Sequence, residues 1–389
     1  MLIRFGAENF SSFDEGVDIS FDLGGQCPSS IKQGNPISTI LCLKGANSSG
    51  KTNILKILAF LKYFCSESFK QDPKEPIPVD SFFFSEKDTY IYCQFQVGNY
   101  EYFYEVSLNR TKVINEKLTR KAKRETLIFH RIENKLSSNS LKSIKELFNR
   151  RFSIRDNASM IDILSQLQFS PLKLVYNFFN NIFTNVKYSG LDPQLSNEYI
   201  VSEYLYNNES KLKFVERALK VFEPNLEEIQ IEPRDINGRT IYEPFFLFRI
   251  NGEPKILSFY LMSSGTKSLY KSLLFYRIVI DNGGLLVLDE FDINLHPLIL
   301  PFLTDLFLDS EINKKNAQFI FTTHNSDIMD KMTKYRTYLV NKDEGASYAY
   351  RLDEIDSTLL RNDRSIAKVY NQSKIGGVPN QDWELSSIW

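Results

Sequence analysis

The sequence has few of the residues that build metal centres and disulfide frameworks. Among its 389 residues are only 4 cysteines and 3 histidines, and no two cysteines form a C-x-x-C pair. Zinc sites and disulfide frameworks need such clusters, so neither is expected here. This sparing use of cysteine is typical of a protein from a reducing compartment.

Long apolar runs and a large excess of charge are also missing. No segment approaches the ~20 apolar residues that a membrane-spanning helix needs. The first residues, Met1 to Phe5, lack the apolar core of a signal peptide. The net charge is −1, so nucleic acid could be bound only through local patches. We therefore expect a cytoplasmic protein that has no contact with a membrane.

Apolar and aromatic residues, in contrast, are abundant. Hydrophobic residues make up 42% of the chain and charged residues 24%, and there are 31 Phe and 20 Tyr. This composition is typical of a folded protein, and the length predicts more than one domain.

Residues 45–52 match the phosphate-loop pattern G-x-x-x-x-G-K-[ST] at every position. They lie between an apolar run, Ile37 to Leu43, and a helix-like run, Asn53 to Phe64. Glycines let backbone N–H groups turn toward a nucleotide's phosphates, and the helix start adds its positive dipole end. The context therefore favours a nucleotide site over an ordinary glycine-rich turn. The residues expected to contact the nucleotide are Gly45, Ala46, Asn47, Ser48, Ser49, Gly50, Lys51, Thr52 and Asn53.

An apolar run that ends in two carboxylates lies far downstream. Leu285 to Leu288 are all apolar, which predicts a strand buried on both faces of a parallel sheet. Ligands bind at the carboxyl ends of such strands. We expect Asp289 and the Thr52 hydroxyl to hold Mg²⁺, Lys51 to reach the β- and γ-phosphates, and Glu290 to act as general base toward water.

A third apolar run, Phe319 to Phe321, leads to His324. It follows the acid-bearing run by about one βα unit, so we expect it in the same sheet. We expect His324 to contact the γ-phosphate or the attacking water. The alternative is a histidine that only ends a strand.

A short hydroxyl-rich segment precedes the acid-bearing run. Ser263, Ser264 and Gly265 lead into an apolar, helix-like run from Leu269 to Ile280. The first N–H groups of that helix would form a second anion site. An ordinary N-cap is the alternative interpretation.

The patterns between these motifs divide the chain. Residues 80–133, including Phe82 to Phe84, resemble antiparallel strands. Residues 138–230 nearly lack glycine and show helical spacing, for example from Leu174 to Phe183. We expect an N-terminal half at 1–134, a helical insertion at 135–230 and a C-terminal half at 231–389. The basic run Lys117 to Arg124 is a solvated hairpin face or, alternatively, a phosphate-contacting patch.

In their order along the chain, these motifs resemble those of the ABC-type ATPases. Residues 263–266 take the place of that family's signature Ser-Gly-Gly-Gln and depart from it at two positions, and residues 294–297 take the place of the D-loop. More narrowly, the chain is similar to the SMC and OLD group, including the "AAA family ATPases" of bacterial restriction and abortive-infection loci (RloA-like and PARIS-type). That likeness rests on residues 3–13, 263–267, 289–297 and 370–380.

The resemblance implies an α/β fold with an ABC-type P-loop ATPase core, an antiparallel β lobe and an inserted helical subdomain. It implies ATP and Mg²⁺ as cofactors. It also implies a homodimer or higher homo-oligomer, in which Ser263, Ser264 and Gly265 of one chain face the γ-phosphate on the other chain's loop. The Q-loop glutamine of the family would be Gln94 or Gln96, and the choice stays open.

The function expected from this resemblance is an ATP-binding and hydrolysing switch in bacterial antiphage defence. OLD-type relatives carry a Toprim nuclease after the ATPase. The stretch after His324 is shorter than an ordinary domain, so we expect a separate effector protein, a toxin or a nuclease. One alternative is an SMC-like DNA-binding or repair ATPase, although residues 138–230 are too short and irregular for a long coiled coil. The other is the nucleotide-binding subunit of a transporter. Nucleic acid stays open as a partner.

Overall fold

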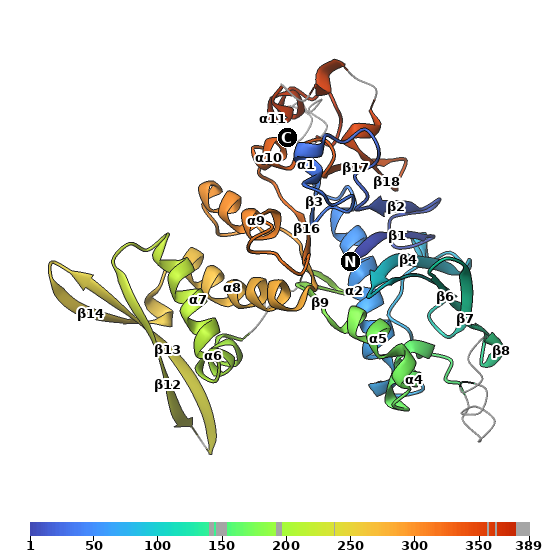
Figure 1. The fold of residues 1–389 in the computed structure, drawn as a ribbon, viewed down its shortest axis with the longest axis horizontal. Helices are drawn as coiled ribbons and strands as arrows, with labels where there is room; N and C mark the ends of the chain where they lie inside the picture. Colours follow the sequence, from blue (N-terminus) through green and yellow to red (C-terminus); the bar gives the residue numbers. More distant parts are fainter. Residues whose placement is uncertain are drawn as a thin grey trace, which may run out of the picture.

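The computed structural model describes residues 1–139, 144, 154–191, 197–236, 238–355, 358–361 and 364–378. Residues 379 and 380, at the end of the tail that carries part of the family likeness, lie outside these ranges. In the described part an antiparallel sheet and a mostly parallel sheet share one core, and a three-stranded sheet lies apart from both (Figure 1).

The antiparallel sheet has the strand order β2-β1-β4-β5-β6-β7-β8. Its strands are β1 (Leu2–Glu8), β2 (Val17–Ser20), β4 (Thr89–Val97), β5 (Tyr100–Leu108), β6 (Val113–Lys121), β7 (Glu125–Ile132) and β8 (Lys135–Asn139). Along β4, buried residues alternate with partly exposed ones, because one face covers the core and the other meets solvent. The prediction of antiparallel strands after residue 88 is confirmed.

The expectation of a strand at Phe82–Phe84 is wrong. These residues form a 3₁₀ turn in which Phe83 and Phe84 have positive φ angles of 44° and 56°. Their rings are 73% and 75% exposed. The Asn9 side chain stabilises the turn by accepting hydrogen bonds from Phe82 N and Ser85 Oγ. This tertiary contact overrides the β preference of three consecutive aromatic residues.

The mostly parallel sheet has the strand order β18-β17-β3-β16-β15-β9, and only β18 is antiparallel to its neighbour. Its strands are β3 (Ile40–Gly45), β9 (Ile182–Thr184), β15 (Leu285–Leu288), β16 (Gln318–Thr322), β17 (Thr337–Asp343) and β18 (Ala346–Arg351). Leu285 and Val287 face one core, and Leu286 and Leu288 face the other. Burial on both faces explains why these runs are entirely apolar.

Helices cover both faces of the parallel sheet. On one side α2 (Lys51–Ser66) fills the space toward the antiparallel sheet, and α4 (Met160–Gln166) and α5 (Lys173–Asn180) pack beside it. On the other side lie α8 (Ser264–Asn282) and α9 (Leu300–Leu308). Near the end of the described chain, α10 (Ile328–Met332) packs against α11 (Ile366–Asn371).

The region expected to be a helical insertion contains strands as well as helices. The helical pattern from Leu174 ends at Asn180, because residues 182–184 form β9 and pair with β15. After β9 come a short hairpin, β10 (Val186–Lys187) with β11 (Gly190–Leu191), and the helices α6 (Glu198–Tyr206) and α7 (Glu209–Lys220). These helices pack on α8 and on the sheet of β12 (Leu226–Ile236), β13 (Arg239–Ile250) and β14 (Glu253–Ser258). The domain boundaries themselves stay a prediction.

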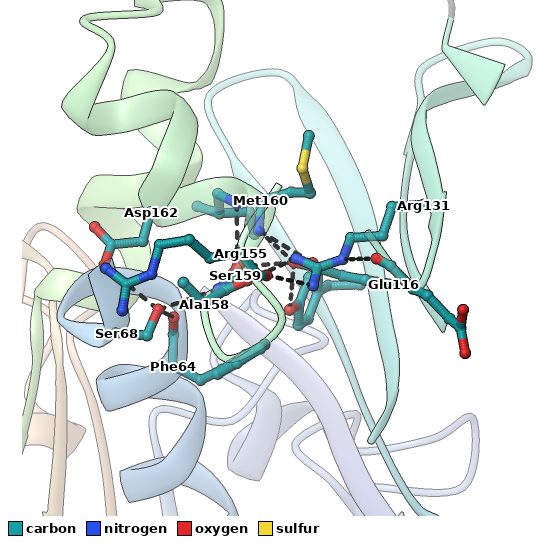
Figure 2. A network of polar contacts seen from close by, with 12 residues as sticks. Phe64, Ser68, Glu116, Arg131, Arg155, Ala158, Ser159, Met160 and Asp162 are labelled. Carbon is teal, nitrogen blue, oxygen red and sulfur yellow. Dashed lines mark hydrogen bonds and ion pairs between the residues drawn. The ribbon is translucent and has the colours of Figure 1, made fainter. Parts of the chain in front are cut away.

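A buried ion pair ties the antiparallel sheet to the segment that leads into α4 (Figure 2). Arg131 on β7 and Glu116 on β6 have fully buried side chains, and their charged atoms are 3.2 Å apart. Glu116 also accepts hydrogen bonds from Tyr104, Ser159 and the Met160 N–H. The three strands and the start of α4 are therefore joined by charge-assisted hydrogen bonds in a dry core.

The described chain thus has the expected α/β architecture, with a mostly parallel sheet covered by helices on both faces and an antiparallel β lobe beside it. Within the ranges that the structure describes, no helix combines the length and the apolar content needed to cross a membrane.

Candidate active site

The phosphate loop, Gly45–Thr52, leaves the carboxyl end of β3 and enters α2. Two of its positions accept only glycine. A Cβ on Gly45 would lie 2.3 Å from the Val340 carbonyl oxygen, and one on Gly50 would lie 2.5 Å from Ser347 Oγ. Gly50 also has a φ of 110°, which L side chains rarely adopt. The glycines of the motif are thus required by close packing as well as by the bend.

Donors inside the loop are left for a ligand. The N–H groups of Gly50, Lys51 and Thr52 donate to no atom of the described residues, and Ser49 Oγ is buried without a partner. Lys51 Nζ crosses the loop to Gly45 O and Ala46 O, at 2.9 and 2.8 Å. Burial lowers the pKa of Lys51, whereas Asp289 and Glu290 raise it. Free N–H groups and an ammonium on a helix start suit a polyphosphate.

Asp289 lies directly after β15, where it meets the loop. Its Oδ2 accepts a 2.6 Å hydrogen bond from Thr52 Oγ1, and its Oδ1 accepts a 2.5 Å bond from Thr322 Oγ1 at the end of β16. The carboxylate is 3% exposed. A hydroxyl and a carboxylate oxygen that meet at one point are hard oxygen ligands of the kind that Mg²⁺ prefers.

Glu290 and His324 face each other beside this pair. His324 Nε2 lies 3.8 Å from Glu290 Oε1, and the two side chains are 50% and 39% exposed. Glu290 has a φ of 48°, a left-handed conformation that is costly for a residue with a Cβ. Its N–H donates to Thr322 Oγ1 at 2.7 Å. Both side chains are therefore partly open to solvent beside the buried Asp289.

Comparison with known proteins places the chain in a family. One family model matches residues 40–330, and its description is "AAA domain, putative AbiEii toxin, Type IV TA system". The chain belongs to this family. With its phosphate loop and acid-bearing strand, it is a nucleotide-binding ATPase.

Solved structures show more distant likeness to the ATPase. The SMC head domain from Thermotoga maritima has 18% sequence identity and a TM-score of 0.42, covering 90% of this chain and 98% of that one. The recombination mediator protein RecF of the RecFOR pathway has 14% identity and a TM-score of 0.41, with the same coverage. The Smc head domain from Pyrococcus yayanosii has 10% identity and a TM-score of 0.43, covering 96% and 99%. No curated protein matches the chain.

The structure thus brings together most of the residues that the motifs single out. Lys51, Thr52, Asp289, Glu290 and His324 meet at the carboxyl edge of the parallel sheet. Asn53 lies in the first turn of α2, where its side chain donates to Ser12 Oγ at 2.8 Å. Their catalytic and ligand roles remain predictions.

The signature segment, Ser263–Thr266, is not part of this group. It begins α8 beside the β12–β14 lobe, which lies apart from the phosphate loop (Figure 1). Ser263 is the N-cap of α8, and its Oγ accepts from the Thr266 N–H. The Thr266 hydroxyl in turn donates to Glu223 at 2.6 Å. The N-cap interpretation is confirmed at the start of α8, and the anion site at the same helix start stays a prediction.

Neither candidate for the Q-loop glutamine lies at the site. Gln94 and Gln96 are on β4 in the antiparallel sheet, and Gln94 donates to Glu101 at 2.6 Å. Asn185 instead follows β9 at the carboxyl edge, next to β15. Its amide accepts from Asp289 N at 2.7 Å and donates to Asp289 O at 2.9 Å.

Sequence reasoning missed Asn185, and also Lys44 and Asp292. Lys44 precedes the phosphate loop, and Asp292 follows Glu290 by two positions. A polar residue directly after a short apolar run was the one available signal for Asn185. That run, residues 182–184, continues the helical pattern that begins at Leu174, which hides the strand.

Proposed function

We propose that this ATPase is a switch subunit of a bacterial antiphage defence system. It self-associates around ATP and controls a separately encoded effector, a toxin or a nuclease. Two arguments support this proposal. The family description names a putative AbiEii toxin and a type IV TA system. The motifs also resemble those of RloA-like and PARIS-type ATPases.

The observation behind self-association is the open start of α8. Ser263 and Ser264 are exposed, and the N–H groups of Ser264 and Gly265 donate to no atom in the described part of the chain. The uncovered N-terminus of this 19-residue helix would attract an anion through its free N–H groups and its dipole. The loop that would bring the anion belongs to a second copy, so two chains together would form each complete nucleotide site.

Within one site, each residue has a proposed role. Lys51 and the free N–H groups of the loop bind the phosphates. Thr52 and Asp289 would hold Mg²⁺, which neutralises charge on the phosphate oxygens when bound. Glu290 accepts a proton from the attacking water, and His324 positions the γ-phosphate or that water. Removal of the γ-phosphate would then release the second chain.

The decisive experiment measures mass in solution with ATP and Mg²⁺. Glu290→Gln should bind ATP, turn it over at least about 100-fold more slowly, and form a dimer by light scattering. Adding Ser264→Glu should prevent the dimer without weakening ATP binding, because the new carboxylate repels the γ-phosphate. Ser264→Ala is the matched control and should still dimerise.

Mixing two impaired chains makes the test specific. Glu290→Gln with Ser264→Glu and Glu290→Gln with Lys51→Ala should each stay monomeric alone. Together they should form a heterodimer, because one composite site has an intact loop and an intact α8 start. A Glu290→Gln protein that binds ATP and stays monomeric would contradict the proposal.

The defence role needs a cellular test. Cells that carry the gene with its neighbouring genes should resist phage, measured as plating efficiency. Lys51→Ala should remove that resistance at equal protein levels. Plating that is the same with and without the wild-type genes, across a broad phage panel, would favour another role.

A second candidate function is nucleic-acid binding, which one surface feature favours. Lys121, Lys123 and Arg124 at the β6–β7 turn are exposed and form no ion pair with any described residue. If they contact phosphates, DNA affinity should fall steeply with salt, and reversing the three charges should flatten that dependence. A flat response in the wild-type protein would leave the turn as a solvated face.

A further inference from the structure

Lys44 is a buried lysine beside the nucleotide site that no motif explains. It lies on β3 directly before the phosphate loop and is only 3% exposed. Its ammonium donates a hydrogen bond to the main-chain oxygen of His324. Burying an ammonium is costly unless its hydrogen bonds are satisfied. The contact with the His324 oxygen therefore stabilises both the buried Lys44 and the position of the His324 backbone.

Asp292 holds the N–H group of the same residue, His324. Asp292 Oδ2 accepts hydrogen bonds from the N–H groups of His324 and Asn325, both at 3.2 Å. Lys44 and Asp292 therefore fix the carbonyl and the amide of one residue. The imidazole of that residue stays free and faces Glu290 at 3.8 Å.

The surroundings of Lys44 lower the pKa of its ammonium. Burial is the main cause and Lys51 adds to it, whereas Asp292 and Asp327 oppose it. A main-chain oxygen and an aromatic face complete its surroundings. The Tyr370 ring centroid lies 5.2 Å from Nζ, within the range of a cation–π interaction.

Tyr370 brings the C-terminal helix α11 to the same place. The ring is 7% exposed and packs in a separate apolar cluster with Leu339 and Val369. Its hydroxyl donates to Gly377 O at 2.7 Å. A cavity of about 510 Å³ has walls from the phosphate loop, His324 and α11. Lys44 thus lies between the histidine and the C-terminal segment.

We propose that Lys44 is a positioning residue that fixes His324 for ATP hydrolysis and couples it to helix α11. The proposal rests on the role of His324 in the proposed function. Lys44 acts through the histidine and not on the phosphates, because its ammonium is directed to His324 O and to the Tyr370 ring. The C-terminal segment would then influence turnover without contacting ATP.

The first test separates turnover from binding. Lys44→Met has a similar shape but no donor, so it should lower kcat about tenfold and change the Kd for ATP less than about threefold. Lys44→Arg keeps a charged donor and should recover most of kcat. Equal loss in both variants, or a loss of ATP affinity that matches the loss of kcat, would overturn the proposal.

A double-mutant cycle shows whether Lys44 acts through His324. His324→Ala should lower kcat, and adding Lys44→Met should lower it no further, because the positioned side chain is already absent. A merely structural lysine would slow both backgrounds by the same factor. That additive result would overturn the proposal.

Amide hydrogen exchange tests the contact of Lys44 with the His324 backbone independently of any catalytic role of His324. In Lys44→Met, the amides of His324 and Asn325 should exchange about fivefold faster, while amides within β16 keep their wild-type rates. Normal turnover in His324→Ala would refute the catalytic role of the histidine. Unchanged exchange in Lys44→Met would refute the clamp itself, whatever the histidine does.

The link to α11 has its own matched pair of variants. Tyr370→Phe keeps the ring over Lys44 and should retain kcat within about twofold. Tyr370→Leu removes the ring and should lower kcat about threefold with ATP affinity unchanged. Identical behaviour of the two variants would overturn the coupling to the C-terminal helix.

Discussion

Two polar clusters in this ATPase differ in how completely their hydrogen bonds are satisfied. Around the Glu116–Arg131 pair, the guanidinium donates to Glu116 and to the carbonyls of Glu133, Ala158 and Arg155. Every charged atom of this pair has a partner inside the protein (Figure 2). At the carboxyl edge of the parallel sheet, in contrast, several loop N–H groups and Ser49 Oγ have none in the described residues.

The difference separates a structural cluster from a binding cluster. Unsatisfied polar groups in a dry interior cost free energy, so a network that only supports the fold leaves few of them. A site for a ligand keeps them until the ligand supplies the missing partner. The same contrast appears in exposure, since Glu116 and Arg131 are fully buried while Glu290 and His324 reach solvent.

Breaking the satisfied cluster should have the largest effect, and the effect should be on stability. Arg131→Met leaves Glu116 buried without its cation, which is expected to lower the unfolding free energy by about 3–5 kcal/mol. Urea denaturation measures this loss. ATP turnover per folded molecule should stay at the wild-type level. A fall in turnover at unchanged stability would place the pair in the active site instead.

Changing the open cluster should affect binding and not stability. Lys51→Ala removes charge-assisted contacts worth about 1.5–3 kcal/mol, so the affinity for ATP should fall roughly 10- to 100-fold. Burial lowers the pKa of Lys51, so the folded state disfavours its charge relative to the unfolded chain. Losing this ammonium therefore should not reduce the unfolding free energy.

Lys56→Ala is the matched control for this variant. Lys56 lies on the same helix just past the loop and is partly exposed. Its removal should leave the affinity for ATP within about twofold. Equal loss of affinity in both variants would contradict the assignment of the loop.

How far the sequence predicts the molecule depends on whether a feature is local. The phosphate loop, the Asp289–Glu290 strand end and the strand before His324 are each contained in a few consecutive residues, and the structure has the predicted local element at each. The Ser263 N-cap is equally local. Each of these features needs particular residue types at fixed spacing, some for the backbone conformation and some for the side chain. Such a combination rarely arises by chance.

Features that depend on tertiary contacts were not predictable. Asn185 matters because the short strand β9 pairs with β15, and the run that forms it continues a helical pattern. The Phe82–Phe84 turn depends on Asn9, which lies far away in the sequence. Lys44 and Asp292 act on His324, which lies in the loop after a different strand, β16. The spacing of apolar residues within one segment does not predict which distant segments will contact each other.

Asn185 offers a smaller and more specific change within the open cluster. Asn185→Ala removes both hydrogen bonds to the Asp289 backbone, each worth about 1 kcal/mol. If Asp289 holds Mg²⁺, the concentration of Mg²⁺ for half-maximal turnover should rise about five- to tenfold. ATP binding without Mg²⁺ should be unchanged. An unaltered Mg²⁺ requirement would show that Asp289 needs no such support.

The smallest effect is expected where an ion pair is exposed. Lys117 follows Glu116 on β6 and pairs with Glu105 on β5 at 2.9 Å. The side chains of Lys117 and Glu105 are 37% and 23% exposed. Solvent screens such a pair, so Lys117→Ala should cost less than about 1 kcal/mol in urea denaturation. Because the same sheet carries both pairs, the gap between Lys117→Ala and Arg131→Met measures what burial adds. Comparable losses would mean that the strands themselves, and not the satisfied network, set the stability of this lobe.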